Sequence, residues 1–230
     1  DISGNTHADC GKQPGTESKE NAEIRYDMTG KAVYSQDLFN EKILEFIRKH
    51  KDEPFFLFHP SQLPHGPIAV PEVHPGVRDV PGLTDFEKEY ASMVLRLDDT
   101  VGLILDELDA LGLADNTVVF FSSDNGHEIY THQPGRTEKR QTLDGVPIDD
   151  IETRYDSELC GDVFNGNDGM AGLKWTSWEG GTRIPYLVRW PGTIEAGSES
   201  NQLIANYDFM PTLADLVGGE MPPDKDGHSF

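Results

Sequence analysis

Apolar positions between residues 35 and 58 follow first a helical and then a strand pattern. Ser35, a favoured N-cap residue, opens the helix, and Arg48 and Lys49 occupy its last turn, where basic side chains suit the helix dipole. The stripe at 3.6-residue spacing consists of Phe39, Ile43, Phe46, Ile47 and His50. Residues 55–58, Phe-Phe-Leu-Phe, follow without alternating polar residues. They therefore predict a strand covered on both faces, as in the centre of an α/β sheet.

A longer helix is predicted in the middle of the chain. Thr84 and Glu87 form a capping-box pattern at its start, and Gly112 marks its end. Its apolar stripe consists of Phe86, Tyr90, Met93, Val94, Leu97, Val101, Ile104, Leu105, Leu108 and Leu111. A turn at 114–116 leads into a second buried strand, residues 117–121. The order strand, helix, strand predicts a crossover unit, and ligands gather at the carboxyl ends of strands in such sheets.

The rest of the chain predicts one more strand, one more helix and several irregular stretches. Residues 186–190 predict a third strand, and Asp208 is the predicted cap of a last helix that Gly218 closes. Residues 126–172 are rich in Asp, Asn and Gly without a clear period, so they predict a surface insertion. Residues 221–230 are expected to complete no element.

Composition and charge narrow the classes of function. The 230 residues are enough for one large α/β domain, and we interpret residues 1–230 as belonging to a single domain. With 41 acidic and 19 basic residues the net charge is −22, a field that repels a phosphate backbone and excludes nucleic acid as a partner. An anionic substrate would therefore need a metal ion or a few local cations to hold it.

Neither the cysteine content nor the hydropathy of the sequence indicates the cellular compartment of the protein. Cys10 and Cys160 allow at most one disulfide, and the sequence does not place them near each other. No apolar run approaches the ~20 residues that cross a bilayer. The start of the chain has neither the basic nor the apolar region of an export signal.

Two polar segments follow the first two predicted strands, and each has an ordinary structural explanation. Asp124 and Asn125 offer a carboxylate beside an amide oxygen, which suits calcium or magnesium, but Asp-Asn-Gly is also common turn chemistry. The loop 59–67 holds His59 and His65 among three prolines. A histidine there can donate a proton at neutral pH, or it can simply be solvated.

The segment before the third strand combines a cation with paired glycines. Lys174 offers a compact positive charge for an oxyanion, while the paired Gly180 and Gly181 let the backbone pass close to another group. The alternative interpretation makes the two nearby tryptophans core residues and pairs Glu179 with Arg183 on the surface.

Taken in order, these three segments resemble the sulfatase family. The matching motifs are Pro-His-Gly-Pro at 64–67, Asp-Asn-Gly at 124–126, and Lys174 followed by Glu-Gly-Gly-Thr-Arg-Ile-Pro at 179–185. Further similar pieces are the Tyr34-Ser35 helix start, Pro54-Phe55-Phe56, Arg-Leu-Asp-Asp around Leu97, and Pro-Thr-Leu after Asp208. The resemblance covers residues 31–230 apart from the insertion. It implies an α/β, alkaline-phosphatase-like fold with a mainly parallel or mixed central sheet flanked by helices, whose N-terminal part is missing here.

The resemblance also implies a role for each site residue. Asp124 and Asn125 would be ligands of one Ca²⁺ or Mg²⁺ ion that polarises a sulfate group. Lys174 would contact a sulfate oxygen, and His65 would lie against the sulfate or the leaving oxygen, where it favours the developing charge. The substrate would be a small-molecule or carbohydrate sulfate ester, and the family implies a periplasmic, secreted or lysosomal location.

One essential part of the family pattern has no match in the chain. Sulfatases carry a Cys or Ser, in Cys-x-Pro-x-Arg or a near variant, that is oxidised to the formylglycine nucleophile. Cys10 opens Cys-Gly-Lys-Gln-Pro and Cys160 opens Cys-Gly-Asp-Val-Phe, so neither fits, and the family's paired N-terminal Asp is also unmatched. We therefore expect this chain to be the internal and C-terminal part of a catalytic domain, with little sulfatase activity by itself.

Other interpretations stay open at this point. Phosphate and phosphonate ester hydrolases of the same superfamily share some of these features, although Asn125 after Asp124 and the retained Lys174 favour a one-metal sulfatase site. A non-catalytic relative would bind only a metal ion or a glycan. Within the insertion, Asn165, Asn167 and Asp168 loosely resemble a calcium loop but do not fit EF-hand spacing. The sequence carries no signature of an oligomeric state.

Overall fold

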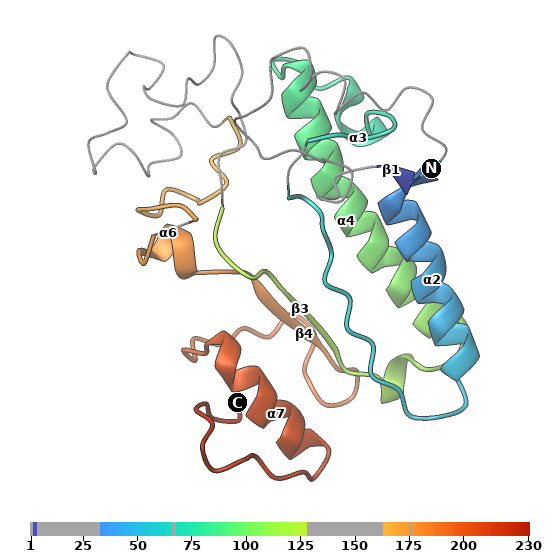
Figure 1. Ribbon diagram of the computed structural model, residues 1–230, viewed down its shortest axis with the longest axis vertical. Coiled ribbons are helices and arrows are strands. Elements are labelled where there is room, and N and C mark those ends of the chain that lie inside the picture. The colour runs from blue at the N-terminus through green and yellow to red at the C-terminus, as the bar shows by residue number, and fades with distance from the viewer. Residues whose placement is uncertain (1, 4–32, 66–67, 128–162, 175) are drawn as a thin grey trace.

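The computed structural model describes residues 2–3, 33–65, 68–127, 163–174 and 176–230. Two long helices lie on one side of a two-stranded ribbon and a short helix lies on its other side (Figure 1). These elements are α2 (Ser35–His50), α4 (Asp85–Ala110), β3 (Val119–Ser122), β4 (Tyr186–Arg189) and α7 (Phe209–Leu216). The shorter elements are β1 (Ile2–Ser3), β2 (Val33–Tyr34), α3 (Pro75–Arg78), η2 (Ala114–Asn116), α6 (Glu179–Thr182) and η3 (Asn206–Asp208).

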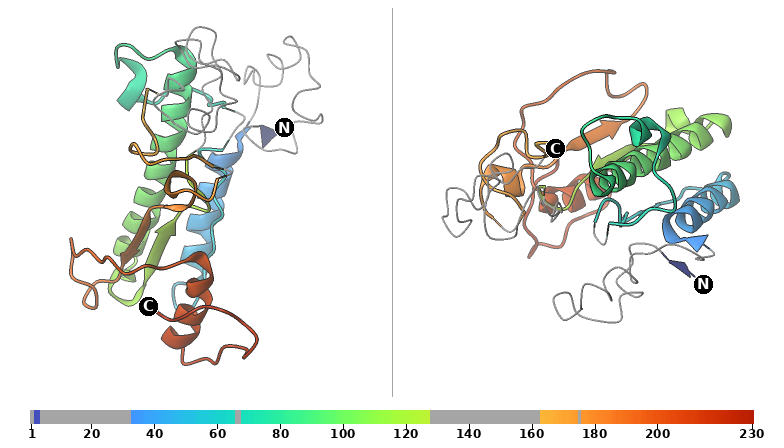
Figure 2. Two further views of the ribbon diagram at one scale, coloured as in Figure 1. Left: turned by 90° about the vertical axis from the view of Figure 1, so that its left-hand side faces the viewer. Right: turned by 90° about the horizontal axis from the view of Figure 1, so that it is seen from above.

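The two long helices, which lie side by side in both views of Figure 2, pack through the predicted apolar stripes. Ile43 and Ile47 of α2 and Leu108 of α4 form the buried centre of this contact. Arg48 closes one end with two hydrogen bonds, of 2.8 and 2.6 Å, to the Glu107 carboxylate. None of the described helices is both long and apolar enough to span a membrane.

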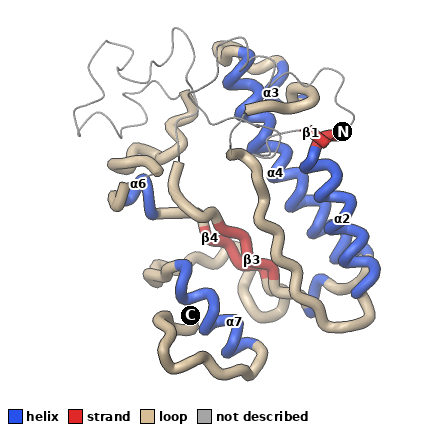
Figure 3. The backbone as a smooth tube through the Cα atoms, in the orientation of Figure 1, coloured by secondary structure: helices blue, strands red, loops and turns tan. Residues whose placement is uncertain are grey.

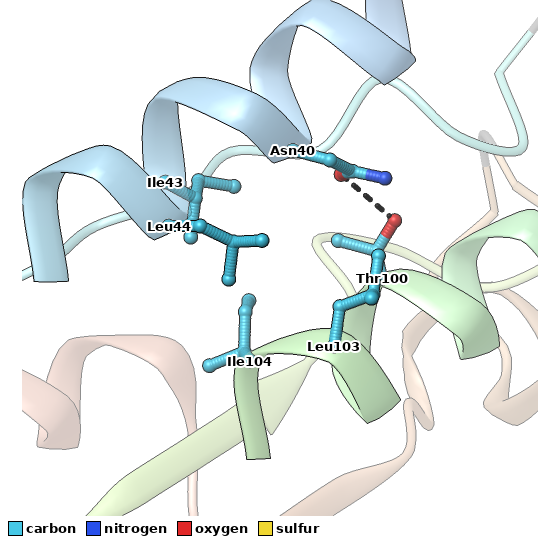
Figure 4. Close-up of a pocket in the computed structure, with 6 residues that line it drawn as sticks. All are labelled: Asn40, Ile43, Leu44, Thr100, Leu103 and Ile104. Atoms are coloured by element: carbon cyan, nitrogen blue, oxygen red, sulfur yellow. Dashed lines mark hydrogen bonds between the residues drawn. The ribbon is translucent and has the colours of Figure 1, made fainter. Parts of the chain in front are cut away.

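A small groove runs between these helices, away from the predicted functional residues. Figure 4 shows its lining residues: Asn40, Ile43, Leu44, Thr100, Leu103 and Ile104. The Thr100 hydroxyl donates a hydrogen bond of 3.0 Å to Asn40 Oδ1 across it. The groove is thus part of the packing interface between α2 and α4.

The caps of the two helices differ in how well the sequence predicts them. The capping box of α4 is confirmed, because Glu87 N–H donates to Thr84 Oγ1 and Thr84 N–H donates to the Glu87 carboxylate. Gly112, at φ +69°, follows the end of α4 as predicted. Ser35 as the N-cap of α2 is wrong, since β2 runs directly into the helix. The extended Tyr34 takes the cap position, and Ser35 is the first, buried helical residue.

The predicted strand at residues 55–58 is only half covered. Phe55 and Leu57 pack against the α2 and α4 core, and the Phe55 ring lies edge-on to Phe46 at 5.9 Å. Phe56 and Phe58 point the other way and are 66% and 71% exposed. Successive side chains of an extended backbone face opposite sides. Burial on both faces is therefore wrong for the described structure, in which this segment is not a paired strand and forms no crossover unit.

The described strands pair in both directions. β1 and β2 are parallel, whereas β3 and β4 are antiparallel, with Val119 opposite Arg189 and Ser122 opposite Tyr186. The predicted strands at 117–121 and 186–190 are confirmed with bounds shifted by one or two residues. The described strands therefore form two separate two-stranded sheets, one parallel and one antiparallel.

Helices cover both faces of the β3–β4 ribbon. On one face Arg189 pairs with Asp109 of α4 at 3.3 Å. On the other face the Phe120 ring lies edge-on to Phe209 of α7 at 5.2 Å. β3 is thereby fixed from two sides, and its carboxyl end leads into the Asp-Asn-Gly segment. Figure 3 shows that the chain from β4 to α7 is largely loop.

The last helix is held by the residues that follow it. Asp208 is the residue before α7, as predicted, but its side chain does not cap that helix. Its carboxylate accepts hydrogen bonds from Ala205 N–H (2.8 Å) and His228 N–H (2.9 Å). Phe230 N–H donates to Thr212 Oγ1 at 3.2 Å. Residues 221–230 form no regular element, as predicted, yet they are tied back onto α7.

Because of these hydrogen bonds, we expect the contribution of Asp208 to the stability of the fold to depend on pH. The backbone N–H groups of His228 and Ala205 hold the pKa of Asp208 below its ordinary value of 3.8. A carboxyl group whose pKa falls on folding stabilises the fold above its unfolded pKa, and that contribution is lost as pH drops through the folded pKa. We expect wild type to exceed Asp208→Asn in urea midpoint at about pH 6, with the difference shrinking towards about pH 3. An equal difference at both pH values would contradict this, and exposed Asp224→Asn is the control.

Candidate functional site

Two predicted site residues that lie 109 positions apart meet in the structure. Lys174 Nζ lies 3.5 Å from His65 Nε2. His65 is exposed and Lys174 is half-buried, so both side-chain ends are accessible to a ligand. An ammonium group beside an imidazole can hold an anion between them, and the imidazole can also carry a proton.

A buried loop core holds His65 in place. The loop residues Leu63, Ile68 and Val70 pack around Met93 of α4. The backbone N–H of His65 donates a hydrogen bond to the backbone carbonyl oxygen of Gln62 at 2.8 Å. The loop that carries His65 is therefore anchored on α4.

Asp124 and Asn125 follow the end of β3, as predicted. Ser123 Oγ donates to the Asn125 carbonyl oxygen, and Asn125 Nδ2 donates to the Gly126 carbonyl oxygen, both at 2.9 Å. The second bond uses the amide nitrogen and leaves Oδ1 as the group of Asn125 that suits a cation. Asp124, which is exposed, adds a carboxylate. A carboxylate and an amide oxygen are ligand types that suit a hard cation such as calcium or magnesium.

The described residues supply only part of a metal shell. They contain no group of three or more His, Cys, Asp or Glu side chains arranged to hold a metal ion. Calcium takes about six to eight oxygen ligands. Asp124 and Asn125 would therefore share the ion with water, substrate or other protein groups.

Backbone hydrogen bonds join the two halves of the site. Lys174 N–H donates to the His127 carbonyl oxygen at 2.7 Å, and Gly126 N–H donates to the Gly181 carbonyl oxygen at 2.9 Å. A third bond, also of 2.9 Å, runs from Gly180 N–H to the Ala171 carbonyl oxygen. Backbone hydrogen bonds thus connect three segments, 124–127, 171–174 and 180–181, which include the candidate metal ligands and Lys174.

Glycine is required where these segments cross. A Cβ on Gly126 would overlap the Gly180 carbonyl oxygen, and a Cβ on Gly180 would overlap the Gly172 carbonyl oxygen. We call Gly126, Gly172, Gly180 and Gly181 the glycine clasp. Gly180 lies against the Gly172 carbonyl group, so the prediction that the paired glycines let the backbone pass close to another group is confirmed.

Other residues of this region follow the ordinary structural interpretation in part. Glu179 and Arg183 form an exposed pair at 3.5 Å, as that interpretation predicts. Trp178 is 41% exposed and is therefore not a core residue, while Trp175 lies outside the described residues. Burial lowers the pKa of His59, so this loop histidine stays neutral at neutral pH and adds no charge to the site.

His127 is a site residue that our interpretation of the sequence did not single out. Its carbonyl oxygen binds Lys174 N–H, and its ring lies 6.4 Å from the Tyr90 ring, which in turn lies 5.7 Å from Phe164. The signal was its position directly after Asp-Asn-Gly. Most of the predicted insertion, residues 128–162, lies outside the described residues, as do Cys10 and Cys160.

Comparison with known proteins shows which family the chain belongs to. The sulfatase family profile matches residues 4–219. The chain belongs to the sulfatase family. It is 33% identical to an N-acetylgalactosamine-6-O-sulfatase of Bacteroides thetaiotaomicron over 82% of its length and 31% of that protein's. It is 31% identical to rat (Rattus norvegicus) steryl-sulfatase over 79% of its length and 26% of that enzyme's.

Solved structures agree with the family. A Bacteroides thetaiotaomicron structure connected with the metabolism of multiple glycosaminoglycans has a TM-score of 0.59 at 31% identity and covers 84% of this chain and 35% of that chain. A structure named i-CgsB, solved with neocarrahexaose, has a TM-score of 0.63 at 24% identity and covers 86% and 38%, and it supports the fold alone. The alkaline-phosphatase-like fold of this sulfatase is thus confirmed. The chain spans about a quarter to a third of the length of its curated relatives.

Proposed function

We propose that the full-length protein containing this chain is a sulfuric ester hydrolase, and that Lys174, His65, Asp124 and Asn125 form part of its active site. The main support for the proposal is that Lys174 Nζ lies 3.5 Å from His65 Nε2, although the two residues are 109 positions apart in the sequence. It places an ammonium group beside an imidazole in a chain of net charge −22. A local positive field of this kind is what an anionic substrate needs here.

Each residue has a distinct part in this reaction. Lys174 binds a sulfate oxygen and stabilises the negative charge that grows there in the transition state. His65 Nε2 lies beside it and can deliver a proton to the leaving oxygen. When bound, a calcium or magnesium ion on Asp124 and Asn125 would supply Lewis-acid polarisation of the sulfate.

The nucleophile is expected outside the residues of this chain. In sulfatases it is a formylglycine, and the sequences around Cys10 and Cys160 do not fit the motif that is converted to it. We therefore expect little turnover from residues 1–230 alone. Sulfate turnover is therefore to be measured on the full-length protein.

The substrate is proposed as a small-molecule or carbohydrate sulfate ester. Similarity to an N-acetylgalactosamine-6-O-sulfatase supports a sugar sulfate, whereas similarity to a steryl-sulfatase supports an apolar alcohol. By family resemblance we expect an exported protein, in a periplasm, a lysosome or the cell exterior.

Comparison of two chromogenic esters tests the proposal. The full-length protein should hydrolyse p-nitrophenyl sulfate with a higher kcat/KM than bis-p-nitrophenyl phosphate. The opposite order would make the protein a phosphoester hydrolase of the same superfamily. Binding of a metal ion or glycan without turnover of either ester would make it a non-catalytic relative.

A further inference from the structure

Asn167 is a buried polar residue with no role in the proposed reaction. Only 3% of its surface is exposed. Its Nδ2 donates two hydrogen bonds, to the Met170 carbonyl oxygen at 2.6 Å and to the Gly172 carbonyl oxygen at 3.0 Å. Among the described residues its Oδ1 has no hydrogen-bond partner. The residue therefore acts through its two N–H donors.

These two bonds shape the turn that leads to Lys174. Gly172, at φ +88°, presents its carbonyl oxygen to Asn167 on one side and to the backbone of Gly180 on another. Leu173 is buried, and its carbonyl oxygen accepts from Thr176 N–H and Oγ1. The backbone is thus held from both directions around Lys174, whose own N–H binds His127.

The hydrogen bonds at position 167 require a side-chain amide and cannot be made by a carboxylate. Two carbonyl oxygens require hydrogen-bond donors facing them, and the NH₂ group of Asn167 supplies both. An aspartate has the same shape but would direct a buried carboxylate at two carbonyl oxygens. Asn165, two residues earlier, has the opposite arrangement, because its Oδ1 accepts from Gly169 N–H at 3.2 Å.

We propose that Asn167 is a positioning residue of the active site: its amide fixes the 170–174 turn, which contains Gly172 of the glycine clasp, and so sets Lys174 Nζ against the substrate sulfate. The inference rests on the proposed function of Lys174. Asn167 itself touches no substrate. A displacement of about 1 Å in a catalytic group can cost about 100-fold in rate. Loss of the Asn167 donors is expected to act in this way.

A double-mutant cycle in the full-length protein tests this coupling. We expect Asn167→Ala to lower kcat/KM for p-nitrophenyl sulfate about 10- to 100-fold when Lys174 is present. In the Lys174→Ala background the same change should cost less than about twofold, because the group that it positions is gone. A similar loss in both backgrounds would overturn the proposal and make Asn167 a purely structural residue.

Two aspartate variants give a matched comparison that depends on the donors rather than on volume. Asn167→Asp should be at least as damaging as Asn167→Ala, whereas Asn165→Asp should stay near wild type because its carboxylate still accepts from Gly169. Wild-type rates for Asn167→Asp would overturn the proposal.

The outcome can be separated from that of the proposed function. Unchanged sulfate turnover in Lys174→Ala would refute the proposed role of Lys174 itself. A strong effect of Lys174→Ala with an independent effect of Asn167→Ala would refute only the positioning role. If Asn167→Ala does not fold, Asn167→Ser, which keeps one donor, is run through the same cycle with the same two outcomes.

Discussion

Replacement of Lys174 by alanine in the full-length protein is expected to lower kcat for p-nitrophenyl sulfate about 100- to 1,000-fold, the usual cost of removing one group that stabilises an oxyanion. Lys174 is half-buried, and its ammonium group lies 3.5 Å from His65, where the proposed substrate sulfate would bind. KM should change less than kcat, because the charge on the sulfate oxygens shifts most in the transition state.

Two controls separate charge from geometry. Lys174→Arg keeps the charge but not its compact shape, and should recover part of the lost rate. Lys51→Ala removes a lysine whose partner is the surface residue Asp52, and should leave kcat unchanged. A kcat within about threefold of wild type for Lys174→Ala would refute its catalytic role.

Gly180→Ala is expected to have the largest effect on stability. A Cβ there would overlap the Gly172 carbonyl oxygen and would lie 3.0 Å from the Ala171 carbonyl oxygen. Both obstacles are backbone atoms, which cannot rotate away as a side chain can. Overpacking usually costs about 1–3 kcal/mol, and we expect this variant at or above the upper end. Urea unfolding measures the loss, which should be accompanied by loss of sulfate turnover because the clasp carries Lys174.

The same substitution in α4 provides the matched control. A Cβ on Gly102 would meet nothing within 4 Å. Alanine is favoured over glycine inside a helix by about 0.5–1 kcal/mol, so Gly102→Ala should raise the urea midpoint. Equal effects of the two substitutions would contradict the close backbone crossing at Gly180.

Local sequence signals predicted the ends of α4 and the close backbone approach at the paired glycines, but not the contacts between distant parts of the site. The capping box at Thr84 and the stop at Gly112 need only neighbouring residues to form, and both are confirmed. The paired glycines predicted a close backbone approach, although not which backbone passes there. The contact between His65 and Lys174 could be expected only through the family resemblance, because no local pattern joins residues 109 positions apart.

The features that the sequence mispredicted depend on distant partners. The continuous apolar run at 55–58 shows that its residues are apolar, but not what covers each face, and Phe56 and Phe58 are exposed. Asp208 is of a residue type that often caps helices, yet its carboxylate accepts a hydrogen bond from the backbone N–H of His228, twenty positions later. The contacts of Asn167 likewise could not be expected from the sequence, because its amide binds the Met170 and Gly172 carbonyl oxygens only once the chain has folded around it.

Metal dependence tests the central claim most directly. The full-length protein and its Asp124→Ala variant are treated with EDTA and then titrated with Ca²⁺ or Mg²⁺ while hydrolysis of p-nitrophenyl sulfate is followed. A site in which Asp124 and Asn125 hold a cation against a sulfate on Lys174 predicts that wild-type turnover is lost on chelation and returns with the cation. The variant should not recover at the same cation concentration. Sulfate turnover that survives chelation, or that returns equally in the variant, would contradict the account.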